Sequence, residues 1–259
     1  MLGITKPAPS WKWAAFGKHP LAGDYFFAGP KDPLFQAFSG WIDNGYKKIG
    51  ASRKNATDLI SWRFCGKALT SDTLLCGIGR DSFDCHGRPY PFFIMGAGTL
   101  PGYSRCWDLL PFAFENLWSQ MEYLCNKRYM DFSQLEADSQ NLPTPENRWK
   151  KFEADRGNRW DTWCSQAPPN QEDIRKALRL HAGSPQFLIP LIEDAAPDVT
   201  STMGLWLSLL KAEEKAVFGT AFFGGNVSKP CLAVFRRPLG TEDFVRLWSD
   251  MADSLSLTP

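Results

Sequence analysis

The sequence predicts an α+β fold in which helices cover both faces of a mainly antiparallel sheet. Apolar, strand-like segments follow one another through short connections, which favours antiparallel pairing. Segments with apolar residues at helical spacing lie between them, and such helices must cover the apolar faces of a sheet. Of the 259 residues, 44% are hydrophobic and 22% are charged, a composition typical of a folded globular chain.

The first expected elements are a strand, a loop and a helix. Residues 11–17 are rich in apolar side chains and predict a strand, and residues 21–31 predict a loop. Asp32 followed by Pro33 indicates a helix start, because Asp caps free N–H groups and Pro fits the first turn. Gly50 predicts the end of this helix. Its apolar face comprises Leu34, Phe38, Trp41, Ile42 and Ile49.

Three further strands and a second helix are expected next. Residues 59–69, 73–78 and 91–100 predict the strands. Asp84 and Gly87 fit the first and fourth positions of a type I turn, so the last two strands should form a hairpin. The helix is marked by Leu110, Phe114, Leu117, Trp118, Met121 and Leu124, with Pro111 in its first turn.

The second half is harder to read from its pattern. Residues 131–170 are polar and predict short helices and loops, packed on the body by three indoles, and residues 172–181 predict a short helix. The apolar segments 203–210, 216–223 and 231–235 predict three strands. The indoles are those of Trp149, Trp160 and Trp163.

A last helix should follow, capped by Thr241, with an apolar face of Phe244, Leu247, Trp248 and Met251. No repeat or linker divides the chain, so we expect one domain over residues 1–259. Within it, residues 1–130 form a motif-bearing core, 131–197 a variable helical and irregular middle, and 198–259 the strands and helix that complete the fold.

Composition excludes several classes of function. The 29 basic and 28 acidic residues leave a net charge of +1 without a block of like charge, which argues against nucleic-acid or anionic-membrane binding. The seven cysteines are odd in number and lack a C-x-x-C motif, as expected of reduced thiols. The sequence shows neither a signal peptide nor a membrane-spanning segment, so we expect a cytoplasmic protein without membrane insertion.

No pattern points to a cofactor, a metal or a small-molecule substrate. Gly77 and Gly79 do not extend to a dinucleotide fingerprint, and no phosphate-binding loop motif occurs. The three histidines are scattered, and the cysteines lack zinc-finger spacing.

One set of residues superficially suggests a hydrolase. Ser82, Asp84 and His86 alternate, but on a strand Ser82 and His86 would lie about 13 Å apart, whereas a nucleophile and its base need a contact of about 3 Å. Cys85 neighbours His86, yet adjacent strand residues point to opposite faces. We therefore expect no catalytic residues.

Other polar residues allow two interpretations. Gly17, Lys18, Pro20, Gly23 and Asp24 either form a tight loop or present fixed charges to a partner. Arg63 should point away from Trp62, with its stem covering apolar surface. Asp84 and Arg88 can pair across the turn, and an exposed pair would contribute only about 0–1 kcal/mol.

Taken together, these motifs resemble the TagF family of proteins associated with bacterial type VI secretion. The order and spacing of the motifs agree over about eighty residues. The motifs are Phe16-Gly17-Lys18-x-Pro20, Gly23-Asp24-Tyr25-Phe26, the helix with Trp41, Trp62-Arg63-Phe64, and Ser82-x-Asp84-x-x-Gly87-Arg88-x-Tyr90-Pro91.

The resemblance implies a longin- or profilin-like antiparallel sheet flanked by helices. It also implies a non-catalytic repressor that acts after translation by binding Fha, the forkhead-associated scaffold protein of type VI secretion. Alternatives are a structural component of the secretion machinery and a hydrolase using Cys85 or Ser82. Lys18, Asp24, Asp84 and Arg88 are the residues to test. They either contact the partner or join loop and hairpin through an Asp24–Arg88 contact.

Overall fold

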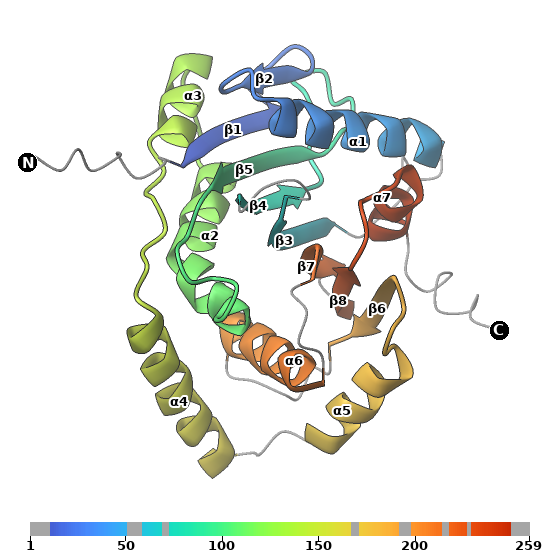
Figure 1. Ribbon diagram of the computed structural model, residues 1–259. Coiled ribbons are helices and arrows are strands. Elements are labelled where there is room, and N and C mark those ends of the chain that lie inside the picture. The colour runs from blue at the N-terminus through green and yellow to red at the C-terminus, as the bar shows by residue number, and fades with distance from the viewer. Residues whose placement is uncertain are drawn as a thin grey trace, which may run out of the picture.

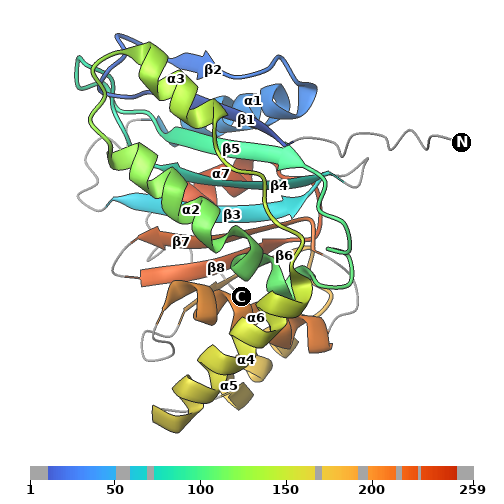
Figure 2. The same cartoon turned by 90° about the vertical axis from the view of Figure 1, so that its left-hand side faces the viewer.

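All described strands belong to one antiparallel sheet (Figures 1 and 2). The computed structural model describes residues 11–50, 59–68, 73–166, 171–191, 198–213, 218–226 and 229–249. The eight strands within them are ordered β2-β1-β5-β4-β3-β7-β8-β6. Their bounds are β1 Lys12–Gly17, β2 Phe26–Ala28, β3 Ile60–Lys67, β4 Leu74–Arg80, β5 Phe92–Gly98, β6 Gln186–Pro190, β7 Thr220–Asn226 and β8 Lys229–Phe235.

Helices cover both faces of this sheet, which confirms the predicted α+β class. In Figure 1, α1 and α7 lie on one side of the strands, and α2 and α6 lie on the other. Figure 2 looks onto the second side, where α3, α4 and α5 are also seen. The bounds are α1 Pro33–Ile49, α2 Leu110–Asn126, α3 Phe132–Gln140, α4 Trp149–Gln166, α5 Gln171–Leu180, α6 Val199–Glu213 and α7 Thr241–Trp248.

Two apolar cores follow from this arrangement. The core beneath α1 and α7 is largely aromatic, and Phe38 stacks on Phe64 with ring centroids 5.1 Å apart. The larger core lies on the α2 and α6 side and includes the buried indoles of Trp118 and Trp206. The aromatic residues that make the composition unusual therefore fill both cores.

The sequence signals at the first two helices are confirmed. The Asp32 side chain accepts a hydrogen bond from the Leu34 N–H at 3.0 Å, and Gly50 ends α1 with a φ of 61°. Pro111 lies at the start of α2, where its missing N–H removes no helical hydrogen bond.

Several predicted elements were wrong or incomplete. Residues 203–210, predicted as a strand, lie inside the helix α6. Strand β2 interrupts the predicted loop 21–31, and β6 was not predicted. The polar middle holds an 18-residue helix, α4, rather than only short ones. Predicted positions 69, 216, 217 and Met251 lie outside the described residues.

The predicted Thr241 cap was also wrong. Gly240 is the N-cap of α7, and the Asp243 carboxylate accepts a hydrogen bond from its N–H at 2.7 Å. Arg237 binds the same carboxylate through both terminal nitrogens, at 2.7 and 2.8 Å. A carboxylate at the third helical position thus replaces the expected hydroxyl cap.

Charged side chains hold α4 against the body. Arg159 donates two hydrogen bonds to Glu115 of α2, at 2.8 and 2.7 Å, and one to Asp198 before α6, at 3.3 Å. The predicted indole packing is confirmed at Trp149, whose N–H donates to the Pro101 carbonyl at 2.7 Å. Trp163 is buried.

Candidate functional site

The loop after β1 and the hairpin between β4 and β5 leave the same end of the sheet. Phe92, the first residue of β5, pairs with both Gly17 and Arg80, the last residues of β1 and β4. A backbone hydrogen bond from the Cys85 N–H to the Ala22 carbonyl, at 2.9 Å, joins loop and hairpin directly. Antiparallel pairing therefore brings two distant sequence motifs together.

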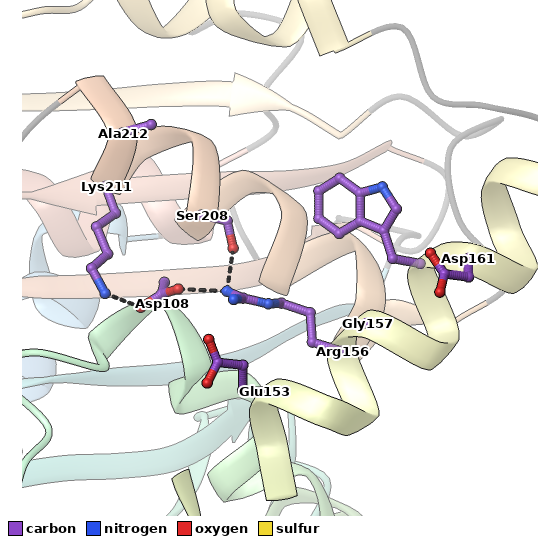
Figure 3. A pocket seen from close by; sticks show the side chains of 9 residues that line it. Asp108, Glu153, Arg156, Gly157, Asp161, Ser208, Lys211 and Ala212 are labelled. Atoms are coloured by element: carbon purple, nitrogen blue, oxygen red, sulfur yellow. Dashed lines mark hydrogen bonds and ion pairs between the residues drawn. The ribbon is translucent and has the colours of Figure 1, made fainter. Parts of the chain in front are cut away.

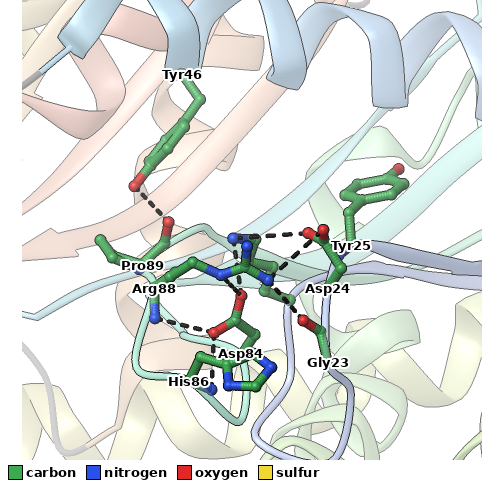
Figure 4. A network of polar contacts seen from close by, with 9 residues as sticks. Gly23, Asp24, Tyr25, Tyr46, Asp84, His86, Arg88 and Pro89 are labelled. Carbon is green, nitrogen blue, oxygen red and sulfur yellow. Dashed lines mark hydrogen bonds and ion pairs between the residues drawn. The ribbon is translucent and has the colours of Figure 1, made fainter.

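Asp84 is the centre of the polar contacts at this end (Figure 4). Its carboxylate accepts hydrogen bonds from Lys18 Nζ at 3.0 Å and from Arg88 Nε at 2.7 Å. The backbone N–H groups of His86 and Arg88 also donate to it, each at 3.0 Å. The Asp84 side chain is fully buried, so the expectation of an exposed Asp84–Arg88 pair was wrong, although the pair itself forms.

These contacts keep the Asp84 carboxylate ionised. Burial by itself would raise the pKa of Asp84, but the hydrogen bonds from Lys18, the backbone N–H groups and the Arg88 guanidinium outweigh burial. Together they hold the pKa of this carboxyl well below its ordinary value. A buried carboxylate with four donors is suited to fixing a loop and not to exchanging protons.

Arg88 extends the contacts to the loop. Its Nη2 donates to the Gly23 carbonyl at 2.6 Å and lies 3.6 Å from the Asp24 carboxylate. The expected Asp24–Arg88 contact therefore forms, and Lys18 lies 3.8 Å from the same carboxylate. The side chains of Asp24 and Arg88 are 70% and 51% exposed, so solvent and other molecules can reach both.

The motif glycines and prolines set the backbone of this end. Gly17 has a φ of 118°, and a Cβ there would lie 2.1 Å from the Pro91 carbonyl oxygen. Gly87 has a φ of 75° and donates its N–H to the Asp84 carbonyl at 2.9 Å, which closes the predicted turn. Pro20 and Ser82 line a pocket beside the hairpin.

Two predicted site residues take other partners. Trp62 is buried under α7 and donates its indole N–H to the Leu247 carbonyl at 3.0 Å. Arg63 points to the opposite face, as predicted, but binds Glu122 of α2 through two hydrogen bonds, at 2.6 and 2.9 Å. Both residues anchor helices to the sheet.

The hairpin does not assemble a hydrolase triad. Asp84 is occupied by Lys18 and Arg88, and within the described residues no hydrogen bond joins Ser82 to His86. Nor does that part of the chain group three or more His, Cys, Asp or Glu side chains so that they could hold a metal ion. No helix among the described residues is both long enough and apolar enough to cross a bilayer.

A hollow of about 640 Å³ lies between α4, α6 and the turn η2 (Trp107–Leu109) (Figure 3). Its central charges bind one another, because Asp108 accepts hydrogen bonds from Arg156 and Lys211, both at 2.5 Å. Arg156 also donates to Ser208 at 2.9 Å. These pairs serve to dock α4 and α6.

A second pocket, of about 470 Å³, lies beside the Asp84 hairpin. The end of α2 and the residues after it, from Cys125 to Tyr129, form its far wall. The sequence did not predict this wall, because no local pattern places residues 125–129 next to residues 19–21 and 80–83.

Comparison with known proteins gives two findings. A family model described as "TagF N-terminal domain, Type VI secretion system-associated" matches residues 14–143. The crystal structure of PA0076 from Pseudomonas aeruginosa PAO1 is similar, with a TM-score of 0.52, 15% sequence identity, and coverage of 93% of this chain and 94% of that chain. At that identity the likeness shows the fold. No curated protein matches the chain.

Proposed function

This chain belongs to the TagF family of type VI secretion-associated proteins, and we propose that it represses type VI secretion without catalysis. It acts in the cytoplasm by binding the forkhead-associated scaffold protein Fha. The family is not a known family of enzymes, and the motif residues of this chain are arranged to hold a surface in shape. A protein that works by binding needs such a preorganised surface.

The observation that carries this proposal is the buried Asp84 carboxylate. Lys18 and Arg88 bind it from the loop and from the hairpin, at 3.0 and 2.7 Å. The two segments therefore form one rigid surface, from which Asp24 and Arg88 remain exposed at 70% and 51%. We infer that Lys18 and Asp84 build the surface, whereas Asp24 and Arg88 contact the partner.

We also infer that residues 1–259 act as one TagF-like unit. Strand β7 pairs along β3, from Ile60↔Asn226 to Gly66↔Thr220. The C-terminal strands thus continue the sheet that carries the motifs, and the middle segment is bound to α2 and α6 through Arg156 and Arg159. The shape of the motif end therefore depends on all three segments.

The test combines secretion with binding. Deleting the gene should raise the amount of type VI substrate in culture supernatants, and overexpression should lower it, both measured by immunoblot. The purified full-length chain should bind purified Fha in isothermal titration calorimetry. Asp24→Lys, which reverses the charge of an exposed side chain, should weaken binding about tenfold or more. It should lower the melting temperature only slightly, by about 2 °C or less, because exposed charges near Lys18 and Arg88 interact weakly.

The matched control is Asp173→Lys, a charge reversal at an exposed position of α5, which should leave binding unchanged. Unchanged secretion after deletion and overexpression, together with no Fha binding, contradicts the proposal. Recovery of the chain in fixed stoichiometry with assembled secretion complexes supports a structural component instead.

A further inference from the structure

The pocket beside the hairpin has a composition that suggests what binds there. It has a volume of about 470 Å³ and lies where β1, β4 and α2 end. Pockets of this volume hold one large side chain or a short segment. The lining residues are His19, Pro20, Leu21, Arg80, Asp81, Ser82, Phe83, Phe92, Cys125, Asn126, Lys127, Arg128 and Tyr129.

The charge of the pocket is positive although the whole chain is nearly neutral. Three basic residues, Arg80, Lys127 and Arg128, face one acidic residue, Asp81. The Asp81 carboxylate is already used, because it accepts hydrogen bonds from the Ile60 N–H at 2.9 Å and the Trp248 indole at 3.0 Å. These neutral donors occupy both oxygens of the carboxylate but leave its negative charge in place. The lining residues therefore carry two more positive than negative charges, and one more if Asp138, which pairs with Lys127 at 2.6 Å, is counted with them.

The basic side chains keep donors available. Arg80 donates to Asn126 at 2.7 Å and Lys127 to Asp138 at 2.6 Å, which leaves other N–H groups of each side chain unused by these bonds. Arg128 is exposed, and within the described part of the chain it forms no ion pair. An arriving carboxylate would thus meet ready donors.

One exposed apolar side chain lines the pocket, and two more lie close in sequence to its far wall. Phe83, on the hairpin, is 51% exposed, and Tyr123, one helical turn before Lys127, is 65% exposed. Met130, next to Tyr129, is 86% exposed. Clusters of large exposed apolar side chains mark interaction sites more often than scattered ones do.

The floor of the pocket is rigid and neutral. The His19 ring packs edge-on against Phe92 and Tyr129, with centroids 5.4 and 5.9 Å apart. Burial lowers the pKa of His19, and its Nδ1 accepts a hydrogen bond from the Leu21 N–H at 3.2 Å. An apolar side chain can therefore enter without displacing a charge.

We propose that this pocket is the docking site for an acidic segment of a partner protein. One aromatic or large aliphatic side chain of the segment enters the pocket between Phe83 and Tyr129. Flanking carboxylates bind Arg80, Lys127 and Arg128. The proposal rests on the proposed function only in naming Fha as the source of the segment. The preference for an acidic segment is argued from the residues that line the pocket.

The direct test uses a defined probe. A fluorescein-labelled peptide Glu-Asp-Leu-Phe-Glu-Asp is titrated with the full-length chain in fluorescence anisotropy. It should bind, and the basic peptide Lys-Arg-Leu-Phe-Lys-Arg should not. The affinity should fall severalfold from about 50 mM to about 300 mM sodium chloride, because the contacts are partly exposed charge pairs.

Matched variants locate the site. Arg128→Glu should weaken peptide binding about tenfold or more, and Phe83→Ala about fivefold. The controls lie on α5. Figures 1 and 2 show α5 far from α3, the helix that follows the pocket wall at residues 125–129. Lys176→Glu is the control for the charge reversal, and Leu180→Ala is the control for the loss of an exposed apolar side chain. Both should bind like the unaltered chain.

The outcomes separate the two proposals. The docking proposal is wrong if the acidic peptide does not bind, or if Arg128→Glu and Lys176→Glu bind it equally well. This conclusion holds whether or not Fha binds the chain. Peptide binding that depends on Arg128, without any binding of Fha, supports the pocket and contradicts Fha as the partner. Full binding of Fha by Arg128→Glu and Phe83→Ala overturns the pocket as the Fha site while leaving the repressor proposal intact.

Discussion

At the scale of one residue, Asp84 holds the loop and the hairpin together, and so supports the surface that we propose for binding. Its carboxylate is buried and accepts from Lys18, Arg88 and two backbone N–H groups. Removing the charge would leave Lys18 and Arg88 with only the exposed and more distant Asp24 carboxylate, at 3.8 and 3.6 Å, as a counterion. The breaking of such a buried pair is far more costly than the loss of an exposed one.

We therefore expect Asp84→Asn to lower the melting temperature by about 5 °C or more. The cause is the loss of the buried anion that binds both cations most closely, at 3.0 and 2.7 Å. Differential scanning fluorimetry measures the change. Asp24→Asn, in the same network but 70% exposed, should shift the melting temperature by less than about 2 °C. Equal shifts for the two variants would show that Asp84 does not hold loop and hairpin together.

The same carboxylate predicts a pH dependence. Because the folded state lowers the pKa of Asp84, its contribution to stability is present above the unfolded pKa of about 3.9 and is lost as pH falls further. The difference in urea midpoint between the unaltered chain and Asp84→Asn should thus be constant near neutrality and shrink below about pH 4. A difference that grows towards acid pH would contradict this.

Gly17 makes a second test at this scale. A Cβ would lie 2.1 Å from the Pro91 carbonyl oxygen, and φ is 118°. Gly17→Ala should lower the free energy of unfolding by about 2–4 kcal/mol, measured by urea denaturation. Gly40→Ala is the control, because no atom lies within 4 Å of its Cβ position in α1. It should raise stability by about 0.5–1 kcal/mol.

At the scale of elements, charged contacts help to dock α4, beside the aromatic side chains that pack it on the core. Arg159 binds Glu115 and Asp198 from that helix. Arg159→Ala should increase hydrogen exchange of the α4 amides about fivefold, which corresponds to about 1 kcal/mol. Lys151→Ala removes a cation whose ion pair among the described residues lies within α4, with Asp155 at 2.8 Å, and should change exchange less. Hydrogen exchange of the α4 amides is measured by mass spectrometry. Equal protection of these amides in Arg159→Ala and Lys151→Ala would contradict the role of Arg159 in docking α4.

The elements also show where sequence patterns fail. Segment 203–210 predicted a strand because it is continuously apolar. In the structure α6 packs against α2, α4, α5 and η2, so nearly all its sides are buried. No stripe of polar residues therefore marks the helical period in its sequence. Strand β6 was missed because it has only five residues and joins the sheet edge through β8, over forty positions later. Elements whose burial is one-sided, such as α1, were predicted correctly.

At the scale of the whole molecule, the sheet topology predicts that the half matched by the family model does not fold by itself. A fragment of residues 1–143 contains the matched region but lacks β7, which pairs with β3 from Ile60 to Gly66. It should be aggregated or should unfold without a cooperative transition, because an unpaired central strand and the α2 core face become exposed. Circular dichroism and size-exclusion chromatography measure this.

Co-expression with residues 144–259 is the control for that fragment and should restore a soluble complex. A monomeric fragment 1–143 with a sharp thermal transition would contradict the single-unit proposal.

The sequence by itself determined the fold class, the caps of α1, the Asp84 turn and the family, because each depends on local periodicity, local turn chemistry or a motif order along the chain. It also placed Asp24, Asp84 and Arg88 among the residues to test. Only the tertiary structure decided that Asp84 is buried, that Lys18 reaches it across 66 positions, and that the end of α2 meets the hairpin to form a basic pocket. Those contacts are fixed by strand order and helix packing, which no local pattern encodes.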